Sequence, residues 1–318
     1  FVFLALLAWS GNILVVIIGY IGLQIASNIA HGPMQGLLPD EVPHGQLGTA
    51  SGLKNLMDMG GLIAASLAAG NLLSPNDRYP TAIMLVVMAV LAASALVTFI
   101  TAREKPTSEL RKEKNLLNLK QIFTIDFHGN KNYFRLIASR FVFLIGIYGV
   151  QTFAQYYIRD VMQAPNPVKA TGDLMAALAV ALVACSVLGG WLTDRFGARR
   201  VLALASLLSA AGCFLLITAR DLQTLTLFGS VLGAGIGFYL TSNWALSSRL
   251  APKGEAGKFL GLTNLATAGA SAFSKLGGIP IDIANNAAPG RFLGYSGMFL
   301  AGGVFALASL ILLARVKE

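Results

Sequence analysis

Charged residues are scarce in this chain. Asp, Glu, Lys and Arg together make up 12% of its 318 residues, whereas about 25% is usual for a soluble domain. Hydrophobic residues make up 55%, and the mean hydropathy is +0.66. A soluble fold of this length cannot bury so much apolar surface. The composition therefore excludes the soluble classes and predicts an all-α, polytopic membrane protein.

Cysteine and histidine are also rare, which argues against disulfides and metal sites. The two cysteines, Cys185 and Cys213, both lie inside apolar runs, so we expect no disulfide framework. His31 has no Cys, Asp or second His at ligand spacing, so no metal site and no cofactor are predicted. The sequence also lacks a nucleophile paired with a base and a Gly-rich phosphate loop. We therefore expect no enzyme, although a membrane-embedded enzyme stays an alternative.

The chain begins with Phe1, not Met, in the middle of an apolar run. This run is shorter than the roughly 20 residues that cross a bilayer. Phe1–Ser10 contains no basic residue, which argues against a signal peptide. We interpret the sequence as a fragment that begins inside a helix.

Nine longer apolar runs follow, and each is long enough to cross a membrane with some tilt. The predicted spans are Ile13–Leu37, Thr49–Leu73, Tyr79–Ala102, Phe134–Ile158, Ala170–Trp191, Val201–Ala219, Gln223–Ser248, Lys258–Ile283 and Phe292–Ala314. The longest polar interval, Arg103–Tyr133, is predicted to be a linker. Its later part is either an interfacial helix, with Leu116, Leu119, Ile122 and Phe123 on one face, or a flexible tether.

The net charge of +9 comes from short loops between the apolar runs. Charge placed in this way sets membrane topology, so we expect no nucleic-acid partner. Sixteen basic residues fall on one side of the predicted spans: Arg103, Lys105, Arg111, Lys112, Lys114, Lys120, Lys131, Arg135, Arg195, Arg199, Arg200, Arg249, Lys253, Lys258, Arg315 and Lys317. The other side has five: Arg78, Arg159, Lys169, Arg220 and Arg291. The bias predicts a protein of the cell (inner or plasma) membrane whose linker and C-terminus are cytoplasmic.

One loop, Gly189–Arg200, carries a specific pattern of charge and glycine. It reads Gly-Gly-Trp-Leu-Thr-Asp-Arg-Phe-Gly-Ala-Arg-Arg and resembles the loop motif Gly-x-x-x-Asp-Arg-x-Gly-x-Arg-Arg of the major facilitator superfamily of transporters. The matching positions are Gly190, Asp194, Arg195, Gly197, Arg199 and Arg200. An ordinary basic hairpin loop between two spans is the alternative interpretation.

An internal repeat supports this resemblance. A shift of 209 residues places Val42–Leu56 on Ala251–Leu265 with seven of fifteen positions identical. Parallel repeats of this kind are typical of the two halves of that superfamily. The resemblance implies two six-helix bundles, here part of helix 3 plus helices 4 to 12. The implied domains are an incomplete first bundle (1-102), a cytoplasmic linker (103-133) and a second bundle (134-318). The loop around Pro39–Pro43 is also loosely similar to bacterial sugar and glycoside symporters.

Polar side chains within the predicted spans are candidates to line a solute cavity, because they are costly in lipid. Two sets each share one helical face: Gln24, Asn28, His31 and Gln35, and then Arg140, Tyr148, Gln151, Gln155 and Arg159. By resemblance their helices line the central cavity, and Asn243 and Trp244 near the inner end of a later helix join them. Hydrogen bonding between helices, with no ligand, is the alternative. Gly229, Gly233 and Gly237 form a ridge of small residues that we interpret as packing.

Three charged residues carry further hypotheses. Lys54 and Asp58 stand one turn apart and form either an intrahelical ion pair or, at Asp58, a proton-coupling carboxylate. Asp194 is predicted to contact the first turn of the helix that begins at Lys258, where backbone N–H groups lack partners. A surface ion pair of Asp194 with Arg195 or Arg199 is the alternative.

Taken together, these features predict a secondary active transporter that moves a small, sugar-like or drug-like solute by alternating access. Whether protons drive the transport is left open by the sequence. A transport-inactive membrane scaffold or sensor with the same fold is a further alternative. The expected surroundings are the lipid bilayer and the solute, and the expected oligomeric state is a monomer.

Overall fold

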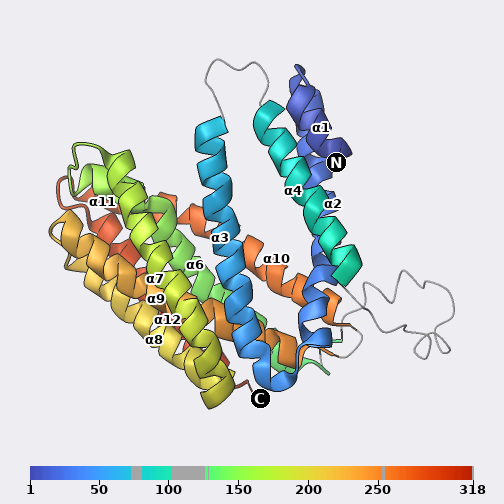
Figure 1. Ribbon diagram of the computed structural model, residues 1–318. Coiled ribbons are helices and arrows are strands. Elements are labelled where there is room, and N and C mark those ends of the chain that lie inside the picture. The colour runs from blue at the N-terminus through green and yellow to red at the C-terminus, as the bar shows by residue number, and fades with distance from the viewer. Residues whose placement is uncertain (73–80, 102–125, 128, 253–254, 317–318) are drawn as a thin grey trace. The chain divides into compact units, whose positions relative to one another are not determined.

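A computed structural model describes residues 1–72, 81–101, 126–127, 129–252 and 255–316 (Figure 1). The described residues form helices and contain no strand, which confirms the predicted all-α class. Most of the predicted linker, including its hydrophobic positions Leu116–Phe123, lies outside the described residues.

The helices follow one another closely along the chain. They are α1 (Val2–Trp9), α2 (Ile13–Glu41), the short 3₁₀ helix η1 (His44–Gln46), α3 (Leu47–Leu72), α4 (Thr81–Thr101), α6 (Lys131–Asp160), α7 (Pro167–Phe196), α8 (Ala198–Ile217), α9 (Leu222–Leu250), α10 (Ala256–Ser274), the 3₁₀ helix η3 (Lys275–Gly277), α11 (Gly278–Ala287) and α12 (Leu293–Leu313).

Seven of the described helices are long and apolar enough to cross a membrane, compared with nine predicted spans. The seven are α2, α4, α6, α7, α8, α9 and α12. The helix α3 is long enough but carries Lys54, Asn55 and Asp58, which lower its hydropathy. The predicted span Lys258–Ile283 is not one α-helix.

This predicted span is interrupted, with α10 ending at Ser274 and α11 beginning at Gly278. The 3₁₀ turn η3 joins them. Gly277 and Gly278 favour the helical conformation weakly, and Pro280 cannot donate a backbone hydrogen bond to the preceding turn. These three residues explain why the apolar run does not continue as one regular helix.

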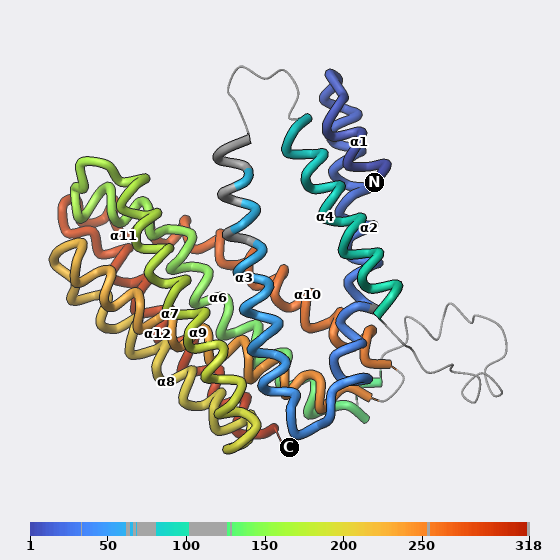
Figure 2. The backbone as a smooth tube through the Cα atoms, viewed as in Figure 1, coloured from blue at the N-terminus to red at the C-terminus, as the bar shows by residue number. Residues whose placement is uncertain are grey.

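The described chain forms two compact units. One comprises Phe1–Ala30 and Gly61–Gly129, and the other comprises His31–Gly60 and Asn130–Glu318. Figure 2 follows the backbone through the whole chain, coloured by residue number. In the first unit, α1 packs on the beginning of α2, where a Cβ at Gly19 would lie 3.3 Å from Leu6. The predicted domains 1-102, 103-133 and 134-318 follow the repeat rather than these contacts, and they stay a prediction.

The second unit contains a tightly packed bundle in which α7 and α9 lie side by side (Figure 1). Cβ atoms at Gly233 and Gly237 of α9 would collide with the carbonyl oxygens of Leu178 and Leu182 on α7. Only glycine allows the two backbones to approach so closely. The glycine ridge is therefore packing, as predicted.

The centre of this bundle is formed by α6, α8, α9 and α12. The ring of Phe143 stacks on the ring of Tyr239 with a centroid separation of 3.6 Å and an interplanar angle of 4°. A Cβ at Gly146 of α6 would lie 2.9 Å from the carbonyl oxygen of Gly302 on α12. These contacts fix the helices from which the polar residues of the candidate site project.

Candidate functional site

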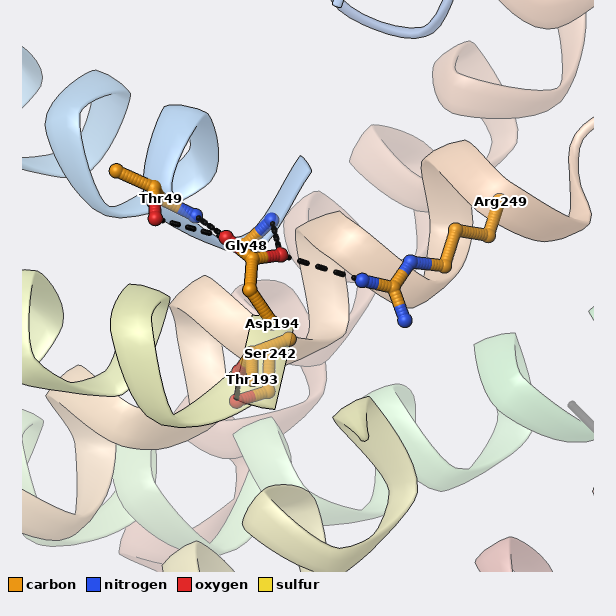
Figure 3. Close-up of polar contacts among 6 residues, drawn as sticks. All are labelled: Gly48, Thr49, Thr193, Asp194, Ser242 and Arg249. Carbon is orange, nitrogen blue, oxygen red and sulfur yellow. Dashed lines mark hydrogen bonds and ion pairs between the residues drawn. The ribbon is translucent and has the colours of Figure 1, made fainter. Parts of the chain in front are cut away.

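Asp194 lies in the last turn of α7 and binds the first turn of α3 (Figure 3). Its Oδ1 accepts a hydrogen bond from the backbone N–H of Gly48 at 2.7 Å. Its Oδ2 accepts two more, from the backbone N–H and the hydroxyl of Thr49, both at 2.7 Å. Amides in the first turn of a helix have no partner within the helix and carry partial positive charge. Asp194 thus caps a helix that lies far away in the sequence.

The partner helix corrects the sequence prediction. We expected Asp194 at the helix that begins near Lys258, but its carboxylate binds Gly48 and Thr49. In the repeat, a shift of 209 residues places Thr49 on Lys258, so the two positions are equivalent. Asp194 does bind the first turn of a helix, as expected, but the helix is the equivalent one in the other half. Because the two helix starts are equivalent in the repeat, the sequence alone does not distinguish them.

The ion-pair alternative is also corrected. Asp194 Oδ1 lies 3.3 Å from Nη2 of Arg249 in the last turn of α9 (Figure 3). Arg195 instead lies over the ring of Trp191, 5.2 Å from its centroid. Arg199 donates a 2.7 Å hydrogen bond to the carbonyl of Ala314, just after α12. The last turn of a helix attracts cations. Arg199 therefore stabilises the end of α12, and Asp194 pairs with Arg249 instead.

Glycines allow α3 to cross α7 at backbone contact. A Cβ at Gly48 would lie 2.5 Å from the carbonyl oxygen of Gly190, and a Cβ at Gly52 would lie 2.6 Å from that of Ser186. Gly197 then has a φ of 90°, which L-residues with side chains rarely adopt, and it separates α7 from α8. The spacing Gly48-x-x-x-Gly52 is a known signal for close helix packing, but our sequence interpretation used it only as part of the repeat.

Two amides that sequence reasoning missed, the buried Asn55 and the half-buried Asn264, each join one copy of the repeat to a helix of the other half. Asn55 Nδ2 donates a 2.9 Å hydrogen bond to the hydroxyl of Thr241 on α9. Asn264 Nδ2 donates a 2.9 Å hydrogen bond to Oε1 of Gln35 on α2. Asn55 and Asn264 occupy equivalent positions of the repeat. Their identity in both copies was the available signal, because each asparagine connects its own copy to a helix of the other.

Arg140 lies in the interior of the second unit, with 3% of its surface exposed. Its Nε donates a 3.0 Å hydrogen bond to the hydroxyl of Thr267, and its Nη1 donates a 2.6 Å bond to Oδ1 of Asn243. Its guanidinium lies over the ring of Trp244, 5.5 Å from the centroid. Two of the predicted cavity residues, Asn243 and Trp244, therefore meet around Arg140.

Lys54 and Asp58 form the intrahelical ion pair that was one of the two alternatives. The Nζ of Lys54 lies 2.5 Å from Oδ2 of Asp58, and the two side chains are 25% and 50% exposed. The same Nζ lies over the ring of Trp244, 4.9 Å from its centroid. The ion pair thus adjoins the surroundings of Arg140. Proton coupling by Asp58 stays a prediction.

The other predicted cavity residues are less enclosed. Gln24, Asn28 and His31 are exposed, and Asn28 Nδ2 donates a 2.8 Å hydrogen bond to the backbone carbonyl of Gln24. On α6, Tyr148 and Gln151 are half-buried and Gln155 is exposed. Gln24 and Asn28 belong to a different compact unit from α6. The prediction that the two sets face each other therefore stays a prediction.

No group of three His, Cys, Asp or Glu side chains comes together within the described ranges. The polar features of this region are the hydrogen-bonding and charged side chains described above. They can fix helices to one another, and they can bind a polar solute.

Comparison with known proteins gives a consistent result. The sequence model of the family described as the Major Facilitator Superfamily matches residues 1–275 and, in a second match, residues 167–318. The multi-drug resistance efflux pump PmrA of Streptococcus pneumoniae is 25% identical over 297 residues, which cover 89% of this chain and 69% of that protein. The multidrug transporter protein MdtP of Bacillus subtilis is 26% identical over 115 residues, 35% of this chain and 21% of that protein.

Solved structures show the same fold. A structure of the Escherichia coli fucose:proton symporter FucP aligns with a TM-score of 0.75 at 14% identity, covering 99% of this chain and 81% of that chain. A bacterial homologue of the iron transporter ferroportin, in an outward-facing state, aligns with a TM-score of 0.70 at 17% identity, covering 95% and 72%.

Proposed function

Since this chain belongs to the major facilitator superfamily and is an integral membrane transporter rather than an enzyme, we propose that it is a secondary active transporter. It moves a small solute across the membrane by alternating access. The energy comes from a solute or ion gradient.

The contact of Asp194 with α3 is the observation that carries this proposal. It consists of three hydrogen bonds between segments that lie 145 or 146 residues apart in the chain, and the same carboxylate pairs with Arg249 of α9. The positive-inside bias places this loop on the cytoplasmic face. A carboxylate at a helix terminus stabilises by about 0.3–1 kcal/mol, and by up to about 2 kcal/mol when partly buried. A contact of this strength biases a two-state carrier several-fold toward the state in which it forms.

This contact closes the cytoplasmic ends of α3 and α7 against each other. In the proposed cycle it forms when the solute site faces outward and breaks when the site faces inward. Its energy is small enough for solute binding to overcome, because a differential affinity of about 1.4 kcal/mol already changes an equilibrium tenfold.

The solute and the coupling ion are the finer parts of the proposal. The curated relatives are named as drug pumps and one structural neighbour as a fucose:proton symporter, which supports a drug-like or sugar-like solute. Asp58 is the candidate for proton coupling, because it is a half-exposed carboxylate whose partner Lys54 can release it.

Transport by the protein made from its full reading frame tests the proposal. The purified protein is placed in liposomes, and flux of ethidium, L-fucose and a panel of organic anions is measured with and without a pH gradient. We expect gradient-driven flux of at least one of these solutes above protein-free liposomes. An Asp58→Asn variant should lose the pH dependence of that flux.

Two results would contradict these statements separately. Flux with an unchanged pH dependence in Asp58→Asn would contradict proton coupling by Asp58 but not the proposal that the protein is a transporter. Absence of flux for every solute in the panel, from protein that keeps its helical circular dichroism, would favour the transport-inactive scaffold.

A further inference from the structure

Arg140 is a buried cation with which no carboxylate of the described residues forms an ion pair. In the part of the chain that the structure describes, it forms no ion pair with an Asp or Glu side chain, and 3% of its surface is exposed. A charge held in a bilayer-spanning helix is expensive and is normally paired. An unpaired one therefore requires an explanation.

Two hydrogen-bond donors at and beside Arg140 have no acceptor within the described residues. Its Nε and Nη1 bind the neutral side chains of Thr267 and Asn243, and its Nη2 makes no hydrogen bond within the described residues. Asn243 is fully buried, and its Nδ2 also has no partner there. The 2.6 Å bond between Arg140 and Asn243 keeps these two donor groups adjacent. Two adjacent donors beside a positive charge match the two oxygens of a carboxylate.

The neighbouring charges do not supply the missing anion. Lys54 lies on the same indole as Arg140, with distances of 4.9 and 5.5 Å to the ring centroid of Trp244. The one carboxylate bound to this pair of cations, Asp58, is engaged by Lys54. The described cluster thus holds two positive charges and one negative charge.

Exposure rises from the interior toward one side of this cluster. The exposed fraction of the whole residue is 3% for Arg140 and 6% for Trp244. The exposed fraction of the side chain is 25% for Lys54 and 50% for Asp58. A solute approaching from the side of Asp58 therefore meets the Lys54–Asp58 ion pair before it reaches the unpaired donors. The two positive charges and one negative charge of the cluster leave a net positive charge, which favours anions over neutral or cationic molecules.

We propose that Arg140, Asn243 and Trp244 form a binding site for the carboxylate group of a small organic anion. The carboxylate oxygens accept hydrogen bonds from Arg140 Nη2 and Asn243 Nδ2, and its charge balances that of Arg140. Since the chain is proposed above to be a transporter, this anion is also the class of solute that it carries. The second statement rests on the proposed function, whereas the binding site does not.

Binding of radiolabelled benzoate to the full-length protein in nanodiscs tests the site. Benzoate and benzamide have nearly the same shape and differ in charge, so unlabelled benzamide is the matched competitor. We expect unlabelled benzoate to displace the label at least tenfold more effectively than benzamide. Displacement by chloride or inorganic phosphate as strong as by benzoate would overturn the assignment to an organic carboxylate.

Variants then locate the binding. Arg140→Gln removes the charge and should weaken benzoate binding at least tenfold, whereas Arg140→Lys keeps the charge without the planar fork and should weaken it less. Arg135→Gln is the matched control, because Arg135 is exposed at the start of the same helix and donates a hydrogen bond to the backbone carbonyl of Arg315. Equal benzoate binding in Arg140→Gln and the unmodified protein would overturn the proposal. If Arg140→Gln does not fold, equal displacement by benzoate and benzamide in the unmodified protein overturns it.

Failure of this inference and failure of the proposed function give different results. Charge-selective benzoate binding without flux of any solute would contradict the transporter proposal and support the carboxylate site. Gradient-driven flux of ethidium or L-fucose, with no discrimination between benzoate and benzamide, would support the transporter proposal and contradict the carboxylate site.

Discussion

Asp194 and Arg140 are both partly or wholly buried charges in the same compact unit, but their surroundings are opposite. Asp194 receives three hydrogen bonds from α3 and pairs with Arg249. Among the described residues, the hydrogen-bond partners of Arg140 are neutral, and the amide of Asn243 next to it has an unused donor.

The difference indicates what each charge does. A buried charge with complete hydrogen bonding stabilises the arrangement in which it is found, so Asp194 holds α3 and α7 together. A buried charge without a counter-ion destabilises the empty protein and is stabilised when an anion arrives. The first charge therefore concerns conformation, and the second concerns the solute.

The largest expected effect comes from Gly48→Ala, which disrupts the Asp194 contact by steric means. The new Cβ would lie 2.5 Å from the carbonyl oxygen of Gly190, so α3 and α7 must separate and the Asp194 hydrogen bonds must lengthen. With cysteine placed at Ser51, we expect maleimide labelling to be about tenfold faster or more, which corresponds to about 1.4 kcal/mol. Gly45→Ala is the control, because nothing lies within 4 Å of a Cβ there.

A carboxylate built into the protein next to Arg140 should stabilise it. In Asn243→Asp, an oxygen replaces Nδ2, and Oδ1, which lies 2.6 Å from Arg140 Nη1, becomes part of a charged carboxylate. We expect the melting temperature of the purified protein in detergent to rise by about 2–4 °C, equivalent to about 1 kcal/mol, and benzoate binding to be lost.

The control for this change is Asn264→Asp. It removes the hydrogen-bond donor to Gln35, and among the described residues no cation binds this asparagine. Asn264→Asp should therefore lower the melting temperature. A lower melting temperature in Asn243→Asp as well would mean that Arg140 already has its counter-ion.

A smaller effect is expected from Arg249→Gln. The pair of Arg249 with Asp194 has a 3.3 Å separation and a 23% exposed arginine side chain, and such pairs contribute about 0–1 kcal/mol. The three hydrogen bonds from α3 remain, so labelling at Ser51→Cys should accelerate by less than about fivefold. An effect as large as that of Gly48→Ala would assign the contact to the ion pair rather than to the helix terminus.

The smallest effect is expected at Asp221, which caps its own helix α9. The hydrogen bond that the carboxylate of Asp221 accepts from the backbone N–H of Thr224 holds the pKa of Asp221 below its usual range. Because its pKa is lower in the folded state, its stabilisation is present above the unfolded pKa of about 3.9 and is lost as the pH falls through the lower, folded pKa.

Melting temperatures should therefore differ between the unmodified protein and Asp221→Ala at neutral pH and converge under acid conditions. A difference that does not depend on pH would show that the charge of Asp221 is irrelevant to the cap.

The sequence predicted the all-α class, the membrane-spanning helices and the importance of the loop around Asp194, because charge scarcity and a spaced motif are local properties. It failed at the partner of that loop, since Thr49 and Lys258 are equivalent in the repeat. The break before Pro280 was missed because the apolar run continues through it. The surroundings of Arg140 come from α6, α9 and α10, and no local pattern shows that these helices bring donors together without an acceptor.

Cysteine accessibility at Ser51 tests most directly whether the Asp194 contact opens and closes. Ser51 is fully buried on the face of α3 that also carries Gly48, Gly52 and Asn55. In a background without Cys185 and Cys213, Ser51→Cys should react slowly with maleimide, relative to protein unfolded in detergent. Asp194→Asn should accelerate the reaction about 5- to 30-fold, since about 1–2 kcal/mol is lost from the contact. Identical rates with Asp194 and with Asn at that position would contradict the account.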